Sequence, residues 1–191
     1  MQIIQTPLAG LLVIEPRIFS DPRGFFFESY NHQQYMEAGM TKPFLQDNFS
    51  HSKKNVIRGL HYQVIQPQAK LVSVSRGIVY DVAVDIRRGS STFGQWFGQL
   101  LSAENHLRMY IPEGFAHGFC VLSEEADFCY KCTDYYCPRG ERGIRWNDPE
   151  LNIAWPIKEA ILSGKDLEYS KLGEIASESL PSFEQKNESI L

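Results

Sequence analysis

Short apolar and aromatic segments recur along the chain, each of the length of a β-strand, and polar turn signals separate them. In chain order they are GLLVIEPRIF (10–19), GFFFESY (24–30), NVIRGLHYQ (55–63), KLVSVSRG (70–77), IVYDVAVDIR (78–87), GQWFGQLL (94–101), LRMYIP (107–112), HGFCVL (117–122) and DFCYKCTDYY (127–136). Turn-forming stretches such as SDPRG, RRGSSTFG and CPRGERG lie between them. Many short strands at this spacing predict a mainly β sandwich or barrel.

Helical signals are few. Asn31 is a candidate N-cap and Gly39 a candidate C-terminal stop, so we expect one short helix between them. Near the C-terminus only the stretch after ILSGKD (161–166) is compatible with a helix. Residues from about 180 onwards are polar and predict a loose tail. No fixed-period repeat or linker divides the chain, which predicts a single domain over residues 1–191.

Composition narrows the class of protein. The chain has 191 residues and a formal net charge of −4, whereas general binders of nucleic acid or membrane surfaces are usually basic. No apolar run approaches the roughly 20 residues of a membrane span. The start MQIIQTPLAG lacks the basic and apolar regions of a signal peptide, so we expect a cytoplasmic protein.

The four cysteines raise the question of a metal site or disulfides, since three of them fall close together in CYKCTDYYC (129–137). The positions of Cys129 and Cys132 differ by an odd number, so a regular strand sends their side chains to opposite faces. Convergent zinc ligands are therefore not expected, and free thiols in a reducing compartment are the better interpretation.

The segment IPEGFAHGF (111–119) has the spacing Pro112-x-Gly114-x-x-His117, which resembles the second conserved box of the cupin jelly roll. Metal-binding cupins carry a His-x-His pair and a Glu in their first box. The comparable stretch here is LHYQ (60–63), with His61 and Gln63. Two histidines without a ready carboxylate make a poor metal set, so a metal-free cupin is expected.

A longer set of segments gives a more specific resemblance. The segments DPRGFFFESY, QDNFSHS, VIRGLHYQ, VYDVAVDIRRGSSTFG, LSAEN, IPEGFAHGF, YKCTDYY, ERGIRWNDPELNIAWP and ILSGKD span residues 21–166. Together they resemble the dTDP-4-dehydrorhamnose 3,5-epimerase family, in the family's order. The resemblance implies a homodimeric cupin-type jelly roll with exchanged N-terminal strands. It also implies that the chain acts without a cofactor on dTDP-4-keto-6-deoxyglucose.

The implied chemistry needs few groups. A ketone at carbon 4 acidifies the hydrogens on carbons 3 and 5, because loss of either proton gives an enolate. Inversion at each carbon requires a base on one face, a proton donor on the other and a group that holds the enolate oxygen.

By resemblance, His61 is the base, Tyr130 the proton donor and Lys70 the residue near the keto oxygen. Asp166 matches the carboxylate that orients the imidazole, although Asp81 is a rival partner. Without the surrounding match, each would more often be a structural or surface residue.

The resemblance also implies a set of substrate contacts. Arg58 matches a contact to the diphosphate and Tyr136 a ring that stacks on thymine. Arg23 and Glu28 match residues that reach the partner subunit's site. The remaining matches are Gln46, Asp47, Asn48, His117, Glu141 and Lys165.

One feature of VIRGLHYQ needs a geometric explanation. Simple alternation along a strand would send Arg58 and His61 to opposite faces. A bulge or local twist at Gly59 would turn both side chains inward.

Two other functions remain open. The HYQVIQPQAK connection is shorter than is usual in the family and has Ala69 where glycine is common, which bears on the shape of the sugar pocket. The first alternative is therefore a 3-epimerase that inverts one carbon only. The second is a non-catalytic nucleotide-sugar-binding cupin, but the presence of both His61 and Tyr130 counts against it.

Overall fold

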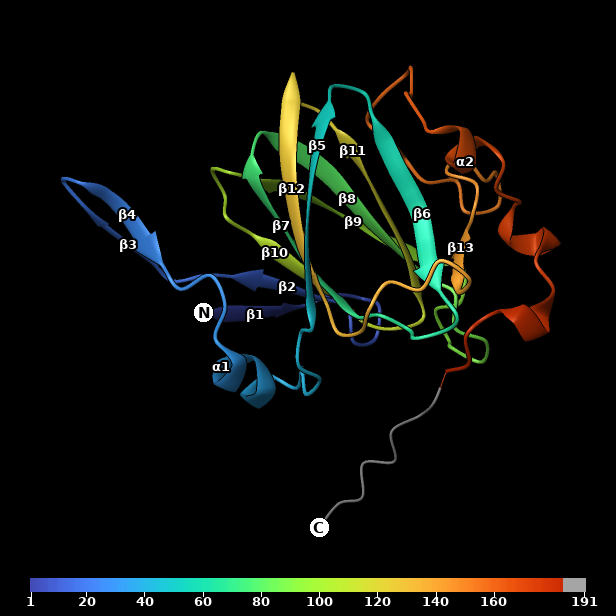
Figure 1. Cartoon of the computed structure of the whole chain (residues 1–191), viewed down its shortest axis with the longest axis horizontal. Helices are drawn as coiled ribbons and strands as arrows, with labels where there is room; N and C mark the ends of the chain where they lie inside the picture. The colour runs from blue at the N-terminus through green and yellow to red at the C-terminus, as the bar shows by residue number, and fades with distance from the viewer. Residues whose placement is uncertain (184–191) are drawn as a thin grey trace, which may run out of the picture.

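Two antiparallel β-sheets face each other in the computed structural model, which describes residues 1–183 (Figure 1). The larger sheet has the strand order β1-β2-β10-β7-β12-β5. Its strands are β1 Gln2–Gln5, β2 Leu12–Glu15, β10 Arg108–Ile111, β7 Lys70–Arg76, β12 Glu125–Cys132 and β5 Gln46–Lys53. The smaller sheet has the order β13-β6-β11-β8-β9. Its strands are β13 Glu141–Gly143, β6 Ile57–Gln63, β11 Phe115–Val121, β8 Ile78–Asp85 and β9 Trp96–Ser102. This architecture is the jelly roll that the sequence predicts.

The core explains why some strands are apolar on both faces. One cluster lies between the sheets and includes Met109, Phe119 and Phe128. A second cluster lies on the outer face of the smaller sheet, where Leu151 and Leu172 of the C-terminal segment cover it. Strands of the smaller sheet are thus covered on both sides, which accounts for the nearly continuous apolar run of β8.

All nine predicted strand segments contain strands, but the first one divides in two. The segment 10–19 contains β2 and the start of β3 (Ile18–Asp21), because the chain leaves the larger sheet around Pro16. Three strands were not predicted: β1, β5 and β13. Strand β5 was not predicted because its inward-facing residues are polar rather than apolar.

The predicted helix is confirmed as α1, His32–Glu37. The Asn31 side chain accepts a hydrogen bond from the backbone N–H of Gln34 at 3.3 Å, as an N-cap does. Gly39 follows the helix with φ of +90°, a conformation that favours glycine.

The C-terminal region holds a short helix, α2 (Gly164–Leu167), and two 3₁₀ turns, Leu172–Glu174 and Ser177–Ser179. The prediction of a loose tail from about residue 180 is wrong for its first residues. Leu180 is buried in the core, and Ser182 forms a β-bridge with Arg88. The rest of the predicted tail, 184–191, lies outside the described residues.

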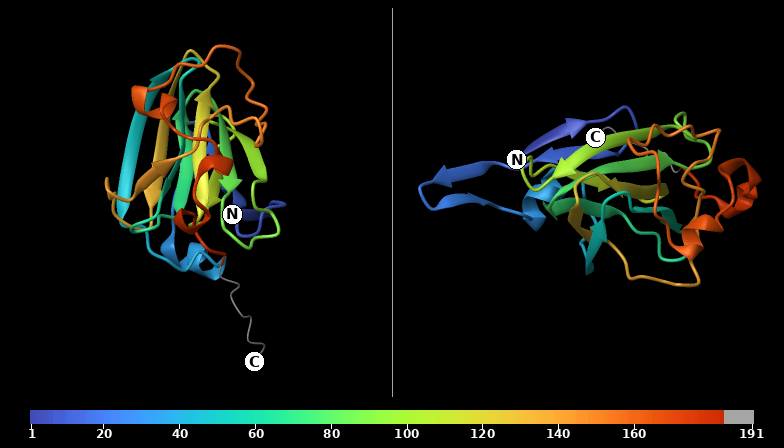
Figure 2. Two further views of the ribbon diagram at one scale, coloured as in Figure 1. Left: turned by 90° about the vertical axis from the view of Figure 1, so that its right-hand side faces the viewer. Right: turned by 90° about the horizontal axis from the view of Figure 1, so that it is seen from above.

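A two-stranded hairpin formed by β3 and β4 (Gly24–Phe27) stands away from the two sheets (Figures 1 and 2). Its aromatic side chains are largely uncovered: Phe25 is 59% and Phe26 68% exposed. At its base Arg108 donates a hydrogen bond to the Ser29 carbonyl, which attaches the hairpin to the larger sheet.

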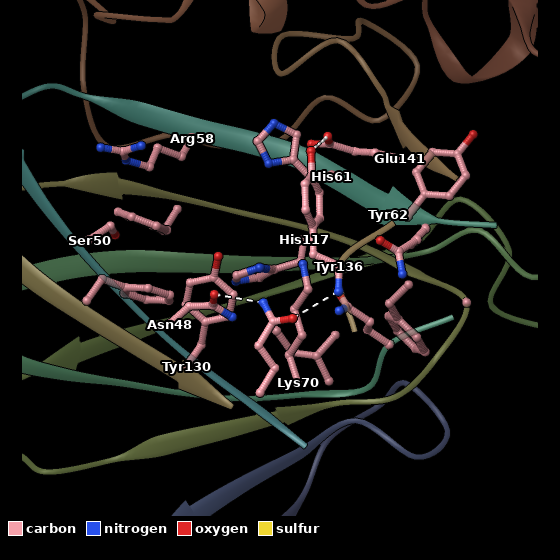
Figure 3. Close-up of a pocket in the computed structure, with 18 residues that line it drawn as sticks. Asn48, Ser50, Arg58, His61, Tyr62, Lys70, His117, Tyr130, Tyr136 and Glu141 are labelled. Carbon is pink, nitrogen blue, oxygen red and sulfur yellow. Dashed lines mark hydrogen bonds between the residues drawn. The ribbon is translucent and has the colours of Figure 1, made fainter. Parts of the chain in front are cut away.

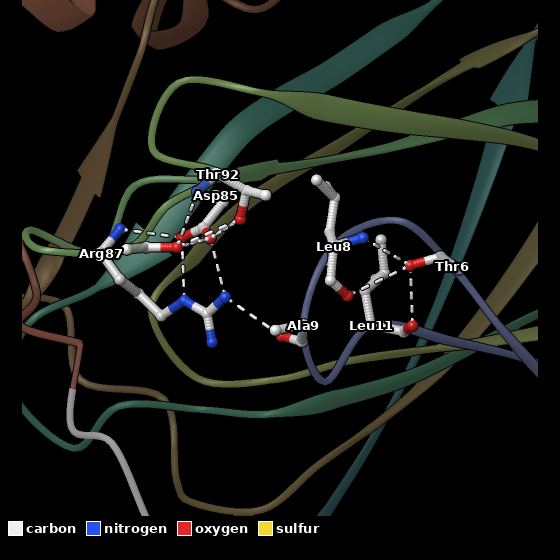
Figure 4. Close-up of polar contacts among 8 residues, drawn as sticks. Thr6, Leu8, Ala9, Leu11, Asp85, Arg87 and Thr92 are labelled. Atoms are coloured by element: carbon white, nitrogen blue, oxygen red, sulfur yellow. Dashed lines mark hydrogen bonds and ion pairs between the residues drawn. The ribbon is translucent and has the colours of Figure 1, made fainter.

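A buried ion pair holds the N-terminal loop against the end of β8 (Figure 4). The Arg87 guanidinium donates to both carboxylate oxygens of Asp85, at 2.8 and 2.7 Å, and to the Ala9 carbonyl at 3.1 Å. Ser90 and Thr92 donate to the same carboxylate. Burial raises the pKa of Asp85, but these hydrogen bonds outweigh it and keep the pKa below its usual range.

Cys129 and Cys132 lie on opposite faces of the strand that carries them. All four cysteines are free; Cys129 touches the outward-facing Ser75 hydroxyl, whereas Cys132 is buried on the opposite face of β12. Within residues 1–183, no helix is long and apolar enough to cross a membrane.

Candidate active site

A cavity of about 370 Å³ lies between the two sheets (Figure 3). Both sheets contribute polar side chains to it from facing strands. The predicted site residues that line it are Gln46, Asn48, Arg58, His61, Lys70, His117, Tyr130, Tyr136 and Glu141. Two more predicted residues, Lys165 and Asp166, hydrogen-bond to lining residues.

His61 on β6 and Asp166 on α2 form a hydrogen-bonded pair. The His61 Nε2 atom lies 2.6 Å from Asp166 Oδ1. The Ser163 hydroxyl accepts from the Asp166 backbone N–H and so begins the helix that carries the carboxylate. With a carboxylate as acceptor, Nε2 carries the hydrogen, and Nδ1 is left as the ring nitrogen able to accept a proton.

Electrostatics favour an ionised partner for this imidazole. Burial raises the pKa of Asp166, but the hydrogen bond and charge of His61, with help from Ser163 and Lys165, hold it below its usual value. Asp81, the rival partner, belongs to a different pair: its carboxylate oxygens lie 3.0 and 3.1 Å from His117 Nε2. Burial lowers the pKa of His117 against the opposing effect of Asp81, which favours a neutral ring.

Tyr130 and Lys70 reach the cavity from the opposite, larger sheet (Figure 3). The strand register places Tyr130 of β12 beside Val72 of β7, and Lys70 beside Cys132. The Lys70 Nζ atom lies 6.0 Å from the centre of the Tyr130 ring. Burial raises the pKa of Tyr130, which keeps its hydroxyl protonated at neutral pH, and burial lowers the pKa of Lys70.

An irregularity in β6 brings Arg58 and His61 to the same cavity. His117 pairs with His61, but Phe119, two residues on, pairs with Arg58, so β6 has an extra residue between these pairs. Gly59 has φ of +131°. The predicted local distortion at Gly59 is therefore present, and both side chains line the cavity.

A hydrogen-bonded group of side chains lies at one side of the cavity. Glu141 accepts hydrogen bonds from the Tyr136 hydroxyl and from Lys165. Burial raises the pKa of Glu141, but these bonds outweigh it and the carboxylate stays ionised. Gln63 stabilises this side: its amide donates to the Tyr135 carbonyl and accepts from the Cys137 N–H.

Three predicted residues do not lie in this cavity. Asp47 is on the outer face of β5, where it pairs with Lys131 at 2.8 Å, because the residues before and after it point inward. Its side chain therefore does not line the cavity in this structure. Arg23 at the hairpin tip pairs with Asp21, and its side chain is 90% exposed. Glu28 accepts from Asn31 and Gln34 near α1.

Two residues in or beside the cavity, Ser50 and Tyr169, were not predicted. Ser50 continues the alternation that begins at Gln46 and Asn48, so a strand assignment for β5 would have identified it. Tyr169 lies behind the catalytic candidate, with its ring 5.8 Å from the His61 ring, and no sequence signal marks it. Within residues 1–183, no three His, Cys, Asp or Glu side chains are grouped as a metal site requires.

The comparisons with known proteins agree on one family. The family model described as dTDP-4-dehydrorhamnose 3,5-epimerase matches residues 5–174. The dTDP-4-dehydrorhamnose 3,5-epimerase of Pseudomonas aeruginosa is 56% identical over 168 residues, covering 87% of this chain and 93% of that protein.

Solved structures give the same result. A dTDP-6-deoxy-D-glucose-3,5-epimerase of Legionella pneumophila, crystallised with dTDP-4-keto-L-rhamnose, superimposes with a TM-score of 0.94 at 55% identity. The match covers 96% of this chain and 99% of that one. A dTDP-4-dehydrorhamnose 3-epimerase of Streptomyces niveus is more distant, at 39% identity over 91% of this chain and 85% of the relative.

Proposed function

The chain belongs to the dTDP-4-dehydrorhamnose 3,5-epimerase family, and from this premise we propose the reaction that it catalyses. It converts dTDP-4-dehydro-6-deoxy-D-glucose into dTDP-4-dehydro-L-rhamnose by inverting carbons 3 and 5. Similarity favours double over single inversion, because the 3,5-epimerase of P. aeruginosa is 56% identical and the 3-epimerase 39%.

The observation that best supports this reaction is that two side chains able to exchange protons enter the cavity from facing sheets. His61 comes from the smaller sheet and Tyr130 from the larger one, and both line the cavity between the sheets. Inversion of a carbon needs a proton removed from one face and another delivered to the opposite face. A sugar ring bound between these residues would meet a base on one side and an acid on the other.

Each inversion begins at His61. The imidazole takes the proton from carbon 3 or carbon 5, and Asp166 stabilises the imidazolium that forms. The electrons of the broken C–H bond pass into the ketone, which becomes an enolate. Tyr130 then donates its hydroxyl proton to the same carbon from the other face, and the ketone is restored. Before the second inversion, His61 releases its proton to solvent and Tyr130 regains one from solvent.

Lys70 stabilises the enolate oxygen. Its ammonium group lies in the partly buried interior of the cavity, where a charge interacts more strongly than it does in water. His117, held by Asp81, lies beside the same region as a neutral hydrogen-bonding group. No step in this scheme requires a redox change or a metal.

The nucleotide occupies the rest of the cavity. Arg58 binds the diphosphate, because a guanidinium fork suits phosphate oxygens. Tyr136, with Glu141 and Lys165 behind it, supplies an aromatic face for thymine. Gln46 and Asn48 contact the base and the deoxyribose.

The active unit is a homodimer in which the β3–β4 hairpins are exchanged. The hairpin stands away from its own sheets and leaves Phe25 and Phe26 uncovered, as a segment that packs on a second copy would (Figure 1). Arg23 and Glu28 then serve the partner's site. The cytoplasm is the compartment, in keeping with four free thiols.

A product analysis tests the reaction directly. Purified protein is incubated with dTDP-4-keto-6-deoxyglucose, and the sugar is identified by NMR after chemical reduction. Inversion at carbons 3 and 5 is expected. Inversion at carbon 3 alone would identify a 3-epimerase, and recovery of unchanged substrate would reject the proposal.

A further inference from the structure

Strand β5 presents a row of four polar side chains to the inside of the molecule. Alternate residues of a strand share a face, and here the inward ones are Gln46, Asn48, Ser50 and Ser52. Strands of antiparallel sandwiches usually fill such positions with apolar residues. A polar row in this place needs partners for its hydrogen-bonding groups.

Three of the four residues have such partners within the chain. The Gln46 amide donates to Asn48 at 2.9 Å and accepts from the Tyr136 N–H. The Asn48 amide also contacts the Cys132 sulfur at 3.6 Å. Ser52 accepts from Arg58 Nε at 3.0 Å.

Ser50 is the exception. Its hydroxyl oxygen is buried and has no hydrogen-bond partner among residues 1–183. The side chain nevertheless lines the active-site cavity (Figure 3). A buried hydroxyl with no partner is unfavourable in the folded protein, so an unsatisfied group that faces a ligand cavity points to a ligand atom.

The neighbours of Ser50 indicate the chemistry of that atom. Ser50 pairs with Phe128 on β12, and Arg58 pairs with Phe119 on β11. The two phenylalanine rings stack with their centres 4.1 Å apart, so Ser50 and Arg58 flank one aromatic pair. Arg58 is itself oriented by Ser52, two residues along from Ser50, and by the His51 carbonyl.

We propose that the Ser50 hydroxyl is a further substrate-binding group, which donates a hydrogen bond to an anionic oxygen that Arg58 also contacts. Given the proposed function, on which this inference rests, that oxygen belongs to the phosphate next to the sugar. Arg58 supplies the charge and Ser50 a short, directed donor. Hydrogen bonds to charged acceptors are stronger than those between neutral groups.

The test compares Ser50→Ala with the wild-type protein by calorimetric titration with dTDP and with dTMP. Loss of a hydrogen bond to a charged oxygen should weaken dTDP binding about tenfold or more. The ratio of the two dissociation constants, dTMP over dTDP, should fall, because the lost contact is to the second phosphate. Ser75→Ala, which alters an outward-facing hydroxyl on β7, is the matched control and should match wild type.

Thermal unfolding without ligand gives an independent test, because Ser50→Ala should weaken ligand binding without lowering the stability of the free protein. Removal of an unsatisfied buried hydroxyl should leave the melting temperature of Ser50→Ala unchanged or raise it, while the stabilisation by dTDP decreases. A lower melting temperature without ligand would mean that the hydroxyl is structural, and would overturn the inference.

The remaining outcomes separate this inference from the proposed function. Wild-type protein that fails to bind dTDP would contradict the proposed function itself. Wild-type binding with an unchanged dTDP affinity in Ser50→Ala would contradict only the role of Ser50. An unchanged ratio of the dTMP and dTDP constants would reject the contact to the second phosphate.

Discussion

The His61 Nε2 atom lies 2.6 Å from a carboxylate oxygen of Asp166, a residue 105 positions later in the chain. The pair joins a strand of the smaller sheet to a four-residue helix that Ser163 caps. Folding therefore assembles the base from two distant segments, and the orientation of the imidazole depends on a helix outside the jelly roll.

Replacement of this carboxylate tests its role. Asp166→Asn keeps a hydrogen-bond acceptor for Nε2 but removes the negative charge that stabilises the imidazolium. We expect kcat to fall about a hundredfold or more, with a smaller change in KM. Steady-state kinetics measure both constants, and a kcat within threefold of wild type would contradict the assignment.

The same residue predicts how stability depends on pH. The folded-state pKa of Asp166 lies below its ordinary value of 3.8, so the ionised carboxylate stabilises the folded protein above that pH. This contribution is lost as the pH falls through the folded-state pKa. We therefore expect the difference in unfolding free energy between wild type and Asp166→Asn, measured by denaturant unfolding from pH 7 to pH 3, to decrease only in the acidic part of this range. An equal difference in unfolding free energy at every pH would contradict this.

Isotope exchange distinguishes the base from the acid. In deuterated water, each inverted carbon should gain one deuterium from a solvent-equilibrated donor. His61→Asn should abolish exchange at carbons 3 and 5, because an amide cannot accept the proton. Tyr130→Phe should retain exchange through His61 but lose inversion at one carbon or both.

NMR of the recovered sugar measures label and configuration together. Circular dichroism confirms that each variant is folded. Full inversion by Tyr130→Phe, or continued exchange in folded His61→Asn, would show that the roles are wrongly assigned.

Lys70 should show a conflict between activity and stability. Its side chain lines the cavity, and burial lowers its pKa because it disfavours the charged form. Lys70→Met keeps the apolar stem and removes the charge, so activity should fall about a hundredfold while the melting temperature stays equal or rises. Lys54→Met, which breaks an exposed pair with Glu124, is the control and should keep wild-type activity. A melting temperature of Lys70→Met below that of wild type would mean that the lysine mainly stabilises the fold.

Exchange of the hairpin predicts complementation between two inactive proteins. Arg23→Ala damages the site of the partner, whereas His61→Ala damages its own site. A mixed dimer then contains one site with both residues intact and one site that lacks both. Each mixed dimer that forms on co-refolding should therefore have up to about half the activity of a wild-type dimer. Size-exclusion chromatography with differently tagged chains confirms mixing, and mixed dimers without activity would argue against a shared site.

The sequence predicted the fold where side-chain character followed the strand period. The segment 78–87 marks a strand because burial on both faces favours a nearly continuous apolar run, which only the paired Asp81, Asp85 and Arg87 interrupt. Strand β5 was missed for the opposite reason. Its inner face borders the cavity instead of the hydrophobic core, so its inward residues are polar and do not alternate with the outward ones in hydrophobicity. The same reason hid Ser50.

The candidate site was predicted mainly through resemblance. What the sequence did not predict is the direction in which individual side chains point and the place where distant segments pack. The motif QDN (46–48) contains three polar residues, but a strand turns only Gln46 and Asn48 inward and leaves Asp47 to pair with Lys131. The choice between Asp81 and Asp166 as partner of His61 could not follow from spacing, because it depends on where α2 packs. Arg23 and Glu28 concern a second chain, which no single-chain pattern describes.

The close approach of β6 and β11 has a consequence for natural and engineered variation. A Cβ atom at Gly59 would lie 2.5 Å from the Gly118 Cα atom, and one at Gly118 would lie 2.7 Å from the Arg58 carbonyl oxygen. Both obstacles are backbone, so even alanine must push apart the two strands that carry His61 and His117. In a saturation mutagenesis screen, these two glycines should therefore tolerate as few replacements as the histidines, although a hydrogen atom is all that either presents to its neighbour.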